Sequence, residues 1–172
     1  MFKKDDIVIY SGYGLCRVMD VTTMNMNGIP KDKLYYTLHQ LSGNGGTIYT
    51  PTEHKEKVLR EVISREEAEA LIDGMADIEV LWVPEERLRE NQYKEALKSC
   101  SCRELVRIIK CLYSRKQDRM AQGKKMTSVD EKYFHIAKEC LYSELSISMD
   151  IPMEDMEAYI TEKIDGPVAA IG

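Results

Sequence analysis

The sequence predicts an α+β protein in which a small β domain precedes an all-α domain. Short runs of β-branched and aromatic residues, separated by glycine-containing turns, fill residues 1–62. The apolar spacing becomes helical after residue 63, and no segment alternates strand with helix. We therefore expect a β domain at 1–62, about five helices at 63–165 and a flexible tail at 166–172.

The β domain is expected to contain five short strands. Asn27-Gly28 with Pro30 marks one turn between them, and the run from Ser42 to Gly46 marks another. Strands this short, joined by glycine turns, are typical of a small barrel or a strongly bent sheet. The expected strands cover residues 7–10, 15–24, 34–38, 47–50 and 58–62.

Capping signals mark the starts of the expected helices. Three helices begin with a capping box, in which a serine and a glutamate three residues later bind the first free backbone amides. The boxes are Ser64/Glu67, Ser101/Glu104 and Ser128/Glu131. The other two helices begin near Pro84 and Pro152, because proline suits a first helical turn. The clearest helical face consists of Leu105, Ile108, Ile109, Leu112 and Tyr113.

The charge of the chain is unevenly distributed. A net charge of −5 argues against binding to free nucleic acid, yet residues 84–126 hold 12 basic and 6 acidic residues. This basic block is flanked by two acidic segments, 64–83 and 127–172. It is either a solvated helix surface with ion pairs, as Glu90 and Lys94 at i,i+4 would form, or a face that contacts phosphates.

Trp82 is the single tryptophan and stands just before the basic block. An amphipathic ring beside basic residues is either a core anchor or a wedge against a DNA base. The sequence alone favours the core anchor.

Catalytic and metal-binding motifs are missing from the sequence. The five cysteines include no C-x-x-C pair, which predicts reduced thiols in a cytoplasmic protein. Gly123-Lys124 is followed by Lys125 rather than by the Ser or Thr of a phosphate-binding P-loop. No apolar run approaches the roughly 18 residues of a membrane span. We expect no enzymatic activity, no cofactor or metal, no membrane partner and no small-molecule substrate.

Several segments, taken in order and spacing, resemble one known family. They are VIYSGYGLCRV at 8–18, KLYYTL at 33–38, TIYTP at 47–51, LRE at 59–61, LWVPEERLRENQYKEALKS at 81–99 and GKKMTSVDEKYFHIAKECLYSEL at 123–145. Together they are similar to motifs of the CarD (CdnL) family of bacterial transcription regulators, over residues 1 to about 163.

The resemblance implies a Tudor-like or SH3-like β barrel that docks on the β subunit of RNA polymerase. It also implies a helical domain that touches promoter DNA at the upstream edge of the melted region, where a tryptophan acts as a wedge. On this basis the wedge is Trp82, supported by Arg87, Arg89 and Lys94. The basic block adds Lys98, Arg103 and Arg107 as candidate phosphate contacts.

For the polymerase contact we expect the strand edge formed by Thr47, Ile48, Tyr49 and Thr50. Some family members have an arginine in this strand where this chain has Tyr49. We therefore expect backbone pairing along the strand together with apolar contact.

The expected function is a transcription regulator that binds RNA polymerase and stabilises the promoter open complex. Its DNA contact would be weak and largely independent of sequence, because polymerase would hold the helical domain close to DNA. One alternative is a protein-interaction adaptor without DNA contact, which predicts no salt-dependent DNA binding. Another is a small thiol or metal enzyme, which predicts a cysteine of low pKa or a bound metal.

Overall fold

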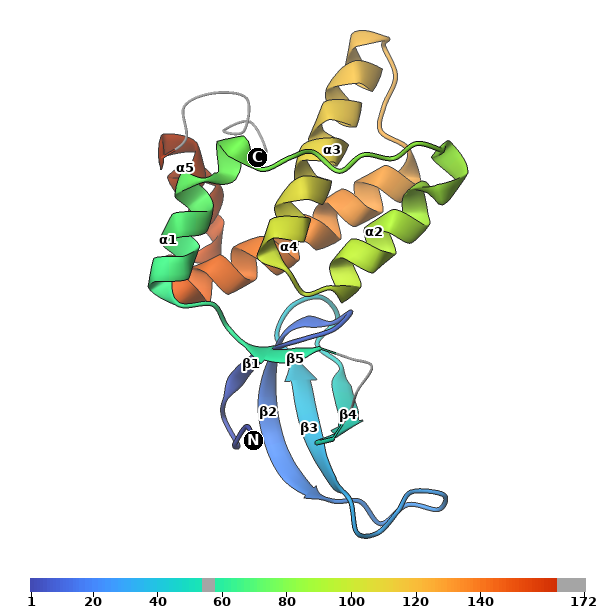
Figure 1. The fold of residues 1–172 in the computed structure, drawn as a ribbon, viewed down its shortest axis with the longest axis vertical. Helices are drawn as coiled ribbons and strands as arrows, with labels where there is room; N and C mark the ends of the chain where they lie inside the picture. The colour runs from blue at the N-terminus through green and yellow to red at the C-terminus, as the bar shows by residue number, and fades with distance from the viewer. Residues whose placement is uncertain (54–57, 164–172) are drawn as a thin grey trace. The chain divides into compact units, whose positions relative to one another are not determined.

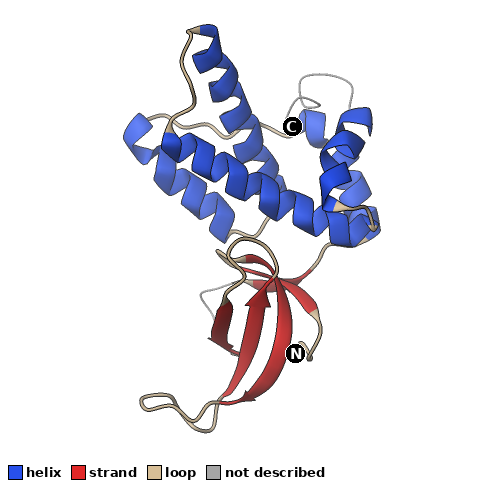
Figure 2. Cartoon of the chain, turned by 180° about the vertical axis from the view of Figure 1, so that it is seen from behind, coloured by secondary structure: helices blue, strands red, loops and turns tan. Residues whose placement is uncertain are grey.

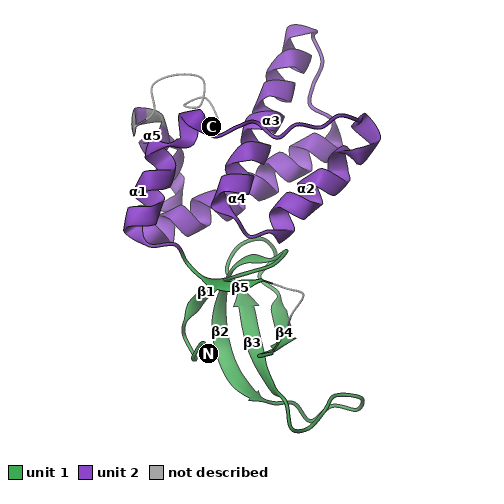
Figure 3. Ribbon diagram, viewed as in Figure 1, with its two compact units in different colours: residues 1–62 green, residues 63–172 purple. Residues whose placement is uncertain are grey.

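The computed structural model describes residues 1–53 and 58–163 of the chain, and the expected tail at 166–172 lies outside these residues. The chain divides into two compact units, Met1–Val62 and Ile63–Gly172 (Figure 3). The first unit is built of strands and the second of helices (Figure 2). The predicted α+β class is therefore confirmed.

The N-terminal unit is an antiparallel sheet of five strands in the order β4-β3-β2-β1-β5 (Figure 1). A register shift between Val18 and Asp20 places a bulge in the second strand, and bulges increase the local twist of a sheet. The strands β4 and β5 form the two edges. The strands are β1 (Ile7–Tyr10), β2 (Gly14–Thr23), β3 (Leu34–Gln40), β4 (Thr47–Pro51) and β5 (Leu59–Glu61).

The core of the sheet unit follows the period-2 alternation of its strands. Each of the three central strands contributes two residues separated by one, and all six are buried: Val8, Tyr10, Cys16, Val18, Tyr36 and Leu38. The hydroxyl of Tyr10 donates a hydrogen bond to Oγ1 of Thr50 at 3.0 Å, which joins β1 to β4. The buried polar pair is thus satisfied within the sheet.

The C-terminal unit contains the five expected helices and two short 3-10 turns. Its core is formed mainly by α3 and α4; α2 packs beside both, and α1 and α5 pack on α4 (Figure 1). The elements are α1 (Arg65–Asp73), η1 (Met75–Asp77), η2 (Glu86–Leu88), α2 (Arg89–Lys98), α3 (Cys102–Ala121), α4 (Ser128–Met149) and α5 (Met153–Lys163). None of the helices within the described part of the chain could span a membrane.

Two of the three expected capping boxes begin at the predicted residue. The Ser64 box is complete, since the side chain of Ser64 and that of Glu67 each accept the other residue's backbone N–H. Ser101 accepts the N–H of Glu104, but the carboxylate of Glu104 turns to Arg107 at 3.0 Å. The second box is therefore only half formed.

The third box is wrong by one residue. The N-cap of α4 is Thr127, whose hydroxyl accepts the backbone N–H of Asp130, and Ser128 is the first helical residue. With Thr127 as the N-cap, Asp130 is the third helical residue, where it is only 1% exposed and its carboxylate binds Arg115 inside the helical unit.

Candidate functional site

The segment between η1 and η2 carries Trp82 and is fastened to α3. The backbone N–H of Leu81 donates to the carbonyl of Arg107 at 3.3 Å, and the Leu81 side chain packs against the helical core. Nζ of Lys110 donates to the carbonyls of Ala76 and Ile78. The residues immediately before Trp82 are therefore held by both main-chain and side-chain bonds, although they have no regular secondary structure.

Trp82 itself points to solvent. Leu81 and Val83 are partly buried, whereas Val80 and Trp82 are 49% and 76% exposed, so inward and outward side chains alternate. The core-anchor interpretation of Trp82 is wrong. The signal that could have revealed this is the L-W-V run itself, because a non-helical segment with Leu81 inward turns its next side chain outward.

A buried polar network holds the residues that follow Trp82. The carboxylate of Asp130 accepts from Nε of Arg115 at 2.7 Å and from the hydroxyl of Tyr93 at 3.1 Å. Nη1 of Arg89 donates to the Tyr93 hydroxyl at 2.8 Å. Arg115 also reaches Glu86 at 3.0 Å. The network thus ties η2, α2, α3 and α4 together, and the sequence did not predict the roles of Glu86 and Asp130.

The protonation of this network follows from its burial and hydrogen bonds. Burial raises the pKa of Tyr93 well above its ordinary value, so its hydroxyl remains a donor to Asp130. Burial, the largest single influence, acts to lower the pKa of Arg115, but the hydrogen bond to Asp130 and the negative charges of Asp130 and Glu86 together leave that pKa raised. The Asp130–Arg115 contact is therefore an ion pair inside the domain.

Most of the basic residues expected to contact DNA already have carboxylate partners. The ion pairs are Arg87–Glu85 at 2.6 Å, Arg89–Glu86 at 3.3 Å, Lys94–Glu90 at 3.6 Å, Lys98–Glu95 at 3.9 Å and Arg107–Glu104 at 3.0 Å. Arg103 is exposed, and no ion pair within the described residues includes it. The structure therefore supports the ion-paired surface that Glu90 and Lys94 predicted.

The paired cations differ in how accessible they are to a phosphate. The side chains of Arg87, Lys94 and Lys98 are 80%, 51% and 64% exposed. Exposed pairs of this kind contribute about 1 kcal/mol or less, so a phosphate can replace the carboxylate. Arg89, whose side chain is only 12% exposed, is bound to Tyr93 and acts as a structural residue.

The predicted polymerase-binding strand β4 alternates between outward and inward side chains. Thr47 is exposed and Tyr49 is 58% exposed, whereas Ile48 packs against the sheet core and Thr50 is buried at 3% exposure. The four predicted residues therefore do not present one side-chain surface. Since β3 is the only described strand that pairs with β4, its outer backbone edge remains available.

Two of the thiols, those of Cys111 and Cys102, lie in surroundings that the structure describes. Burial raises the pKa of the Cys111 thiol, which is the opposite of what a thiol nucleophile needs. The thiol of Cys102 donates to the buried carboxylate of Glu144 at 3.1 Å. No group of three or more His, Cys, Asp or Glu residues within the described parts of the chain is placed to hold a metal ion.

Comparison with known families divides the chain at nearly the same place as the fold. Residues 2–63 match the profile described as the CarD-like/TRCF RID domain. Residues 82–161 match the profile described as the CarD C-terminal domain, and Trp82 is the first residue of that match. No match was found among curated proteins.

Proposed function

We propose, because the chain belongs to the CarD-like family of RNA polymerase-interacting transcription regulators, that it stabilises the promoter open complex. In this proposal the sheet unit binds the β subunit of polymerase. The helical unit contacts DNA at the upstream fork of the bubble through Trp82. Both contacts together would hold the melted DNA in place.

The proposed DNA contact depends on the exposure of Trp82. Its side chain is 76% exposed, on a segment that is hydrogen-bonded to α3. Leaving a large aromatic ring in water forgoes the favourable burial that such a ring normally contributes. Apolar side chains that insert between base steps unstack them at a cost of about a few kcal/mol per step. The backbone that leads to the indole is already hydrogen-bonded to α3, so less backbone freedom remains to be lost on binding.

The observation that supports the polymerase contact is the outer edge of β4. No strand among the described residues pairs with this edge, so its backbone groups can add a strand from a partner, and Tyr49 supplies an exposed aromatic ring beside them. Thr50 cannot contribute its side chain unless its hydrogen bond with Tyr10 breaks. We therefore assign the contact to backbone pairing along the strand and to the ring of Tyr49.

The paired cations support a weak intrinsic affinity for DNA. Arg87, Lys94 and Lys98 must exchange a carboxylate for a phosphate, so each gains less than an unpaired cation would. Tethering through polymerase raises the local concentration of the helical unit near DNA and compensates for this. The protein would thus contact DNA mainly within the polymerase complex.

The test is the lifetime of open complexes formed by the cognate polymerase on one promoter. Trp82→Ala should shorten this lifetime about tenfold, the equivalent of about 1.4 kcal/mol, while polymerase binding persists. Trp82→Phe should retain part of the effect because it keeps an aromatic ring. An unchanged lifetime with Trp82→Ala would refute the wedge.

In a parallel pull-down, Tyr49→Glu should weaken binding to the polymerase β subunit.

A protein-interaction adaptor without DNA contact is the second candidate. It is favoured by one observation, the ion pairing of five of the six predicted DNA-contacting cations. The two candidates differ in how the DNA affinity of the polymerase complex depends on salt. A regulator that contacts phosphates makes this affinity fall more steeply as salt rises, whereas an adaptor without DNA contact leaves the salt dependence unchanged. In either case we propose that the chain acts in the cytoplasm without catalysing a reaction.

A further inference from the structure

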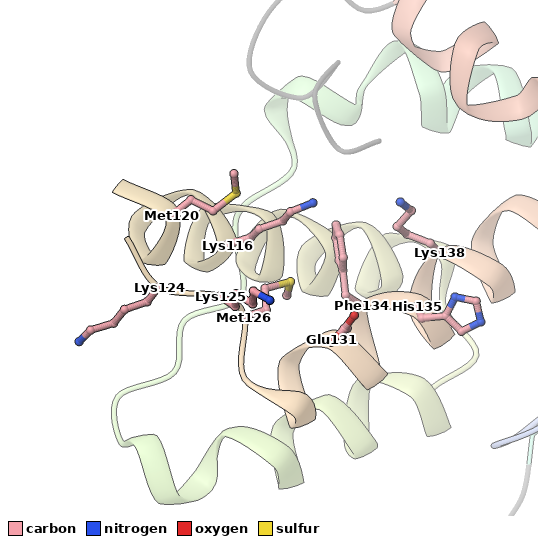
Figure 4. A pocket seen from close by; sticks show the side chains of 9 residues that line it. All are labelled: Lys116, Met120, Lys124, Lys125, Met126, Glu131, Phe134, His135 and Lys138. Carbon is pink, nitrogen blue, oxygen red and sulfur yellow. The ribbon is translucent and has the colours of Figure 1, made fainter. Parts of the chain in front are cut away.

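A cavity of about 520 Å³ lies in the helical unit, between the C-terminal part of α3, the loop that follows it and the first turns of α4. Figure 4 shows its lining, which includes four lysines and only one carboxylate, Glu131. Binding sites for small ligands commonly have volumes of about 300–1,000 Å³. The cavity is therefore large enough for a small molecule, and its charged lining is cationic.

The lysines of this cavity are less compensated than the cations of α2. Lys116, Lys124 and Lys125 form no ion pair with any carboxylate in the described residues, and Lys138 approaches Glu157 only at 3.9 Å. Four cations gathered around one concavity raise the local potential and attract anions. The basic block thus has two parts, one neutralised by neighbouring carboxylates and one open to an external anion.

The floor of the cavity is apolar. The ring of Phe134 is almost fully buried, and Nζ of Lys116 and of Lys138 lie 6.0 Å and 4.9 Å from its centroid. Figure 4 shows these two lysines approaching the ring from α3 and from α4. Met126 is partly buried beside it and packs against the helical core. Methionine adapts its shape readily, so this floor can accept a flat apolar group.

We propose that this cavity binds a nucleoside polyphosphate as an effector of the protein. The phosphates would contact Lys116, Lys125 and Lys138, and the base would lie against Met126 and the small exposed part of Phe134. A DNA duplex is a poorer fit, because its phosphates lie on a convex surface whereas these groups line a concave one. The proposal goes beyond the polymerase and DNA contacts and depends on neither.

The experiment is calorimetric titration of the full chain with ATP, GTP, tripolyphosphate and adenosine. We expect ATP or GTP to bind saturably, with tripolyphosphate and adenosine each at least tenfold weaker, and binding to weaken as salt rises. The double variant Lys116→Gln/Lys125→Gln should lose at least tenfold in affinity. Glu131→Gln should bind two- to threefold more tightly, since it removes the only carboxylate of the lining.

The matched control is Lys31→Gln/Lys33→Gln, which removes the same charge from an exposed loop of the sheet unit. It should leave the affinity within twofold of wild type, and circular dichroism should show that both double variants are folded. The proposal fails if no nucleotide binds at millimolar concentration or if the control weakens binding equally. It also fails if tripolyphosphate binds as tightly as ATP, or if a short duplex binds at these lysines while nucleotides do not.

Discussion

Tyr49 and Trp82 are both exposed aromatic residues, yet the chain supports them in different ways. Tyr49 lies on a strand, paired with Thr37 of β3, and its exposure follows from the alternation of the ladder. Trp82 lies on a segment without regular structure, fastened through Leu81 to α3 and followed by a network that centres on Asp130. A ladder spreads its support over many backbone bonds, whereas the Trp82 segment relies on a few side chains. Single substitutions should therefore disturb Trp82 more easily than Tyr49.

The largest expected effect is that of Asp130→Ala. This change leaves Arg115, whose side chain is 23% exposed, with Glu86 as its remaining carboxylate, and the buried hydroxyl of Tyr93 loses its acceptor. Removing one partner of a buried pair costs about 3–5 kcal/mol, and because Arg115 keeps Glu86 we expect the lower end of that range, about 3 kcal/mol. Chemical denaturation followed by residue-resolved NMR should show the loss in the helical unit, with the amide of Tyr49 unaffected. Asp130→Asn should cost less, because its amide oxygen can still accept from Tyr93. If Asp130→Ala lowered the free energy of unfolding by less than about 1 kcal/mol, the network around Asp130 would not be a main support of the helical unit.

The second effect is a loss of stability of the helical unit in alkali. Burial, followed by the hydrogen bond to Glu90, raises the pKa of Tyr133 to about 12. Below pH 10 the tyrosine is protonated in both folded and unfolded chains, so its contribution is complete. Between pH 10 and 12 only the unfolded chain loses the proton, and stability falls by about 1.4 kcal/mol per unit. Tyr133→Phe should make urea midpoints less pH-dependent in this window; an unchanged slope would contradict the assignment.

The third effect tests the sheet side of the comparison. Tyr10→Phe removes the donor to the buried Oγ1 of Thr50 and should cost the sheet unit about 1–2 kcal/mol. The backbone ladder between β3 and β4 should nevertheless keep Tyr49 in place. Hydrogen exchange of the amides of β4 is the measurement, and the helical unit of the same molecule is the control. If the ladder of β4 opened completely, support at Tyr49 would depend on side chains more than on the ladder, as we infer for Trp82.

The same contrast explains what the sequence could predict. All five strands and all five helices appear close to their predicted positions, because alternation, glycine turns and capping residues act over a few neighbours. The pair Glu90–Lys94, four residues apart on one helix, was predictable for the same reason and is confirmed at 3.6 Å. Local sequence patterns therefore predicted most of the secondary structure.

The supports of the Trp82 segment were not predictable, since they join residues far apart in the chain. Arg115 belongs to the basic block, and Asp130 and Glu86 bind it. Lys110 belongs to the same block, and the carbonyls of Ala76 and Ile78 bind it. A charge count over 84–126 cannot distinguish cations that hold the fold from those left for a partner.

A smaller effect is expected from Glu86→Gln, which weakens the ion pairs of η2 with Arg115 and with Arg89. Glu86 is 70% exposed, so the loss of stability should stay below about 1 kcal/mol. The residues of η2 should nevertheless exchange their amide hydrogens faster, because Glu86 joins η2 to Arg115 of α3 and to Arg89 of α2. Glu95→Gln is the matched control, since it also weakens an exposed pair, with Lys98, but leaves η2 untouched. Equal exchange in both variants would show that the ion pairs of Glu86 do not position the segment.

The smallest expected effect is the most informative about function. Trp82→Ala and Tyr49→Ala should each change the free energy of unfolding by no more than about 0.5 kcal/mol, because both rings are mainly in solvent. Each should still weaken its proposed contact, with DNA for Trp82 and with polymerase for Tyr49. Thermal denaturation of the two variants beside wild type is the measurement. If Trp82→Ala cost more than about 1 kcal/mol, the indole would be a packed residue and its loss would act through the fold. A neutral result makes any change in open-complex lifetime a measure of contact alone.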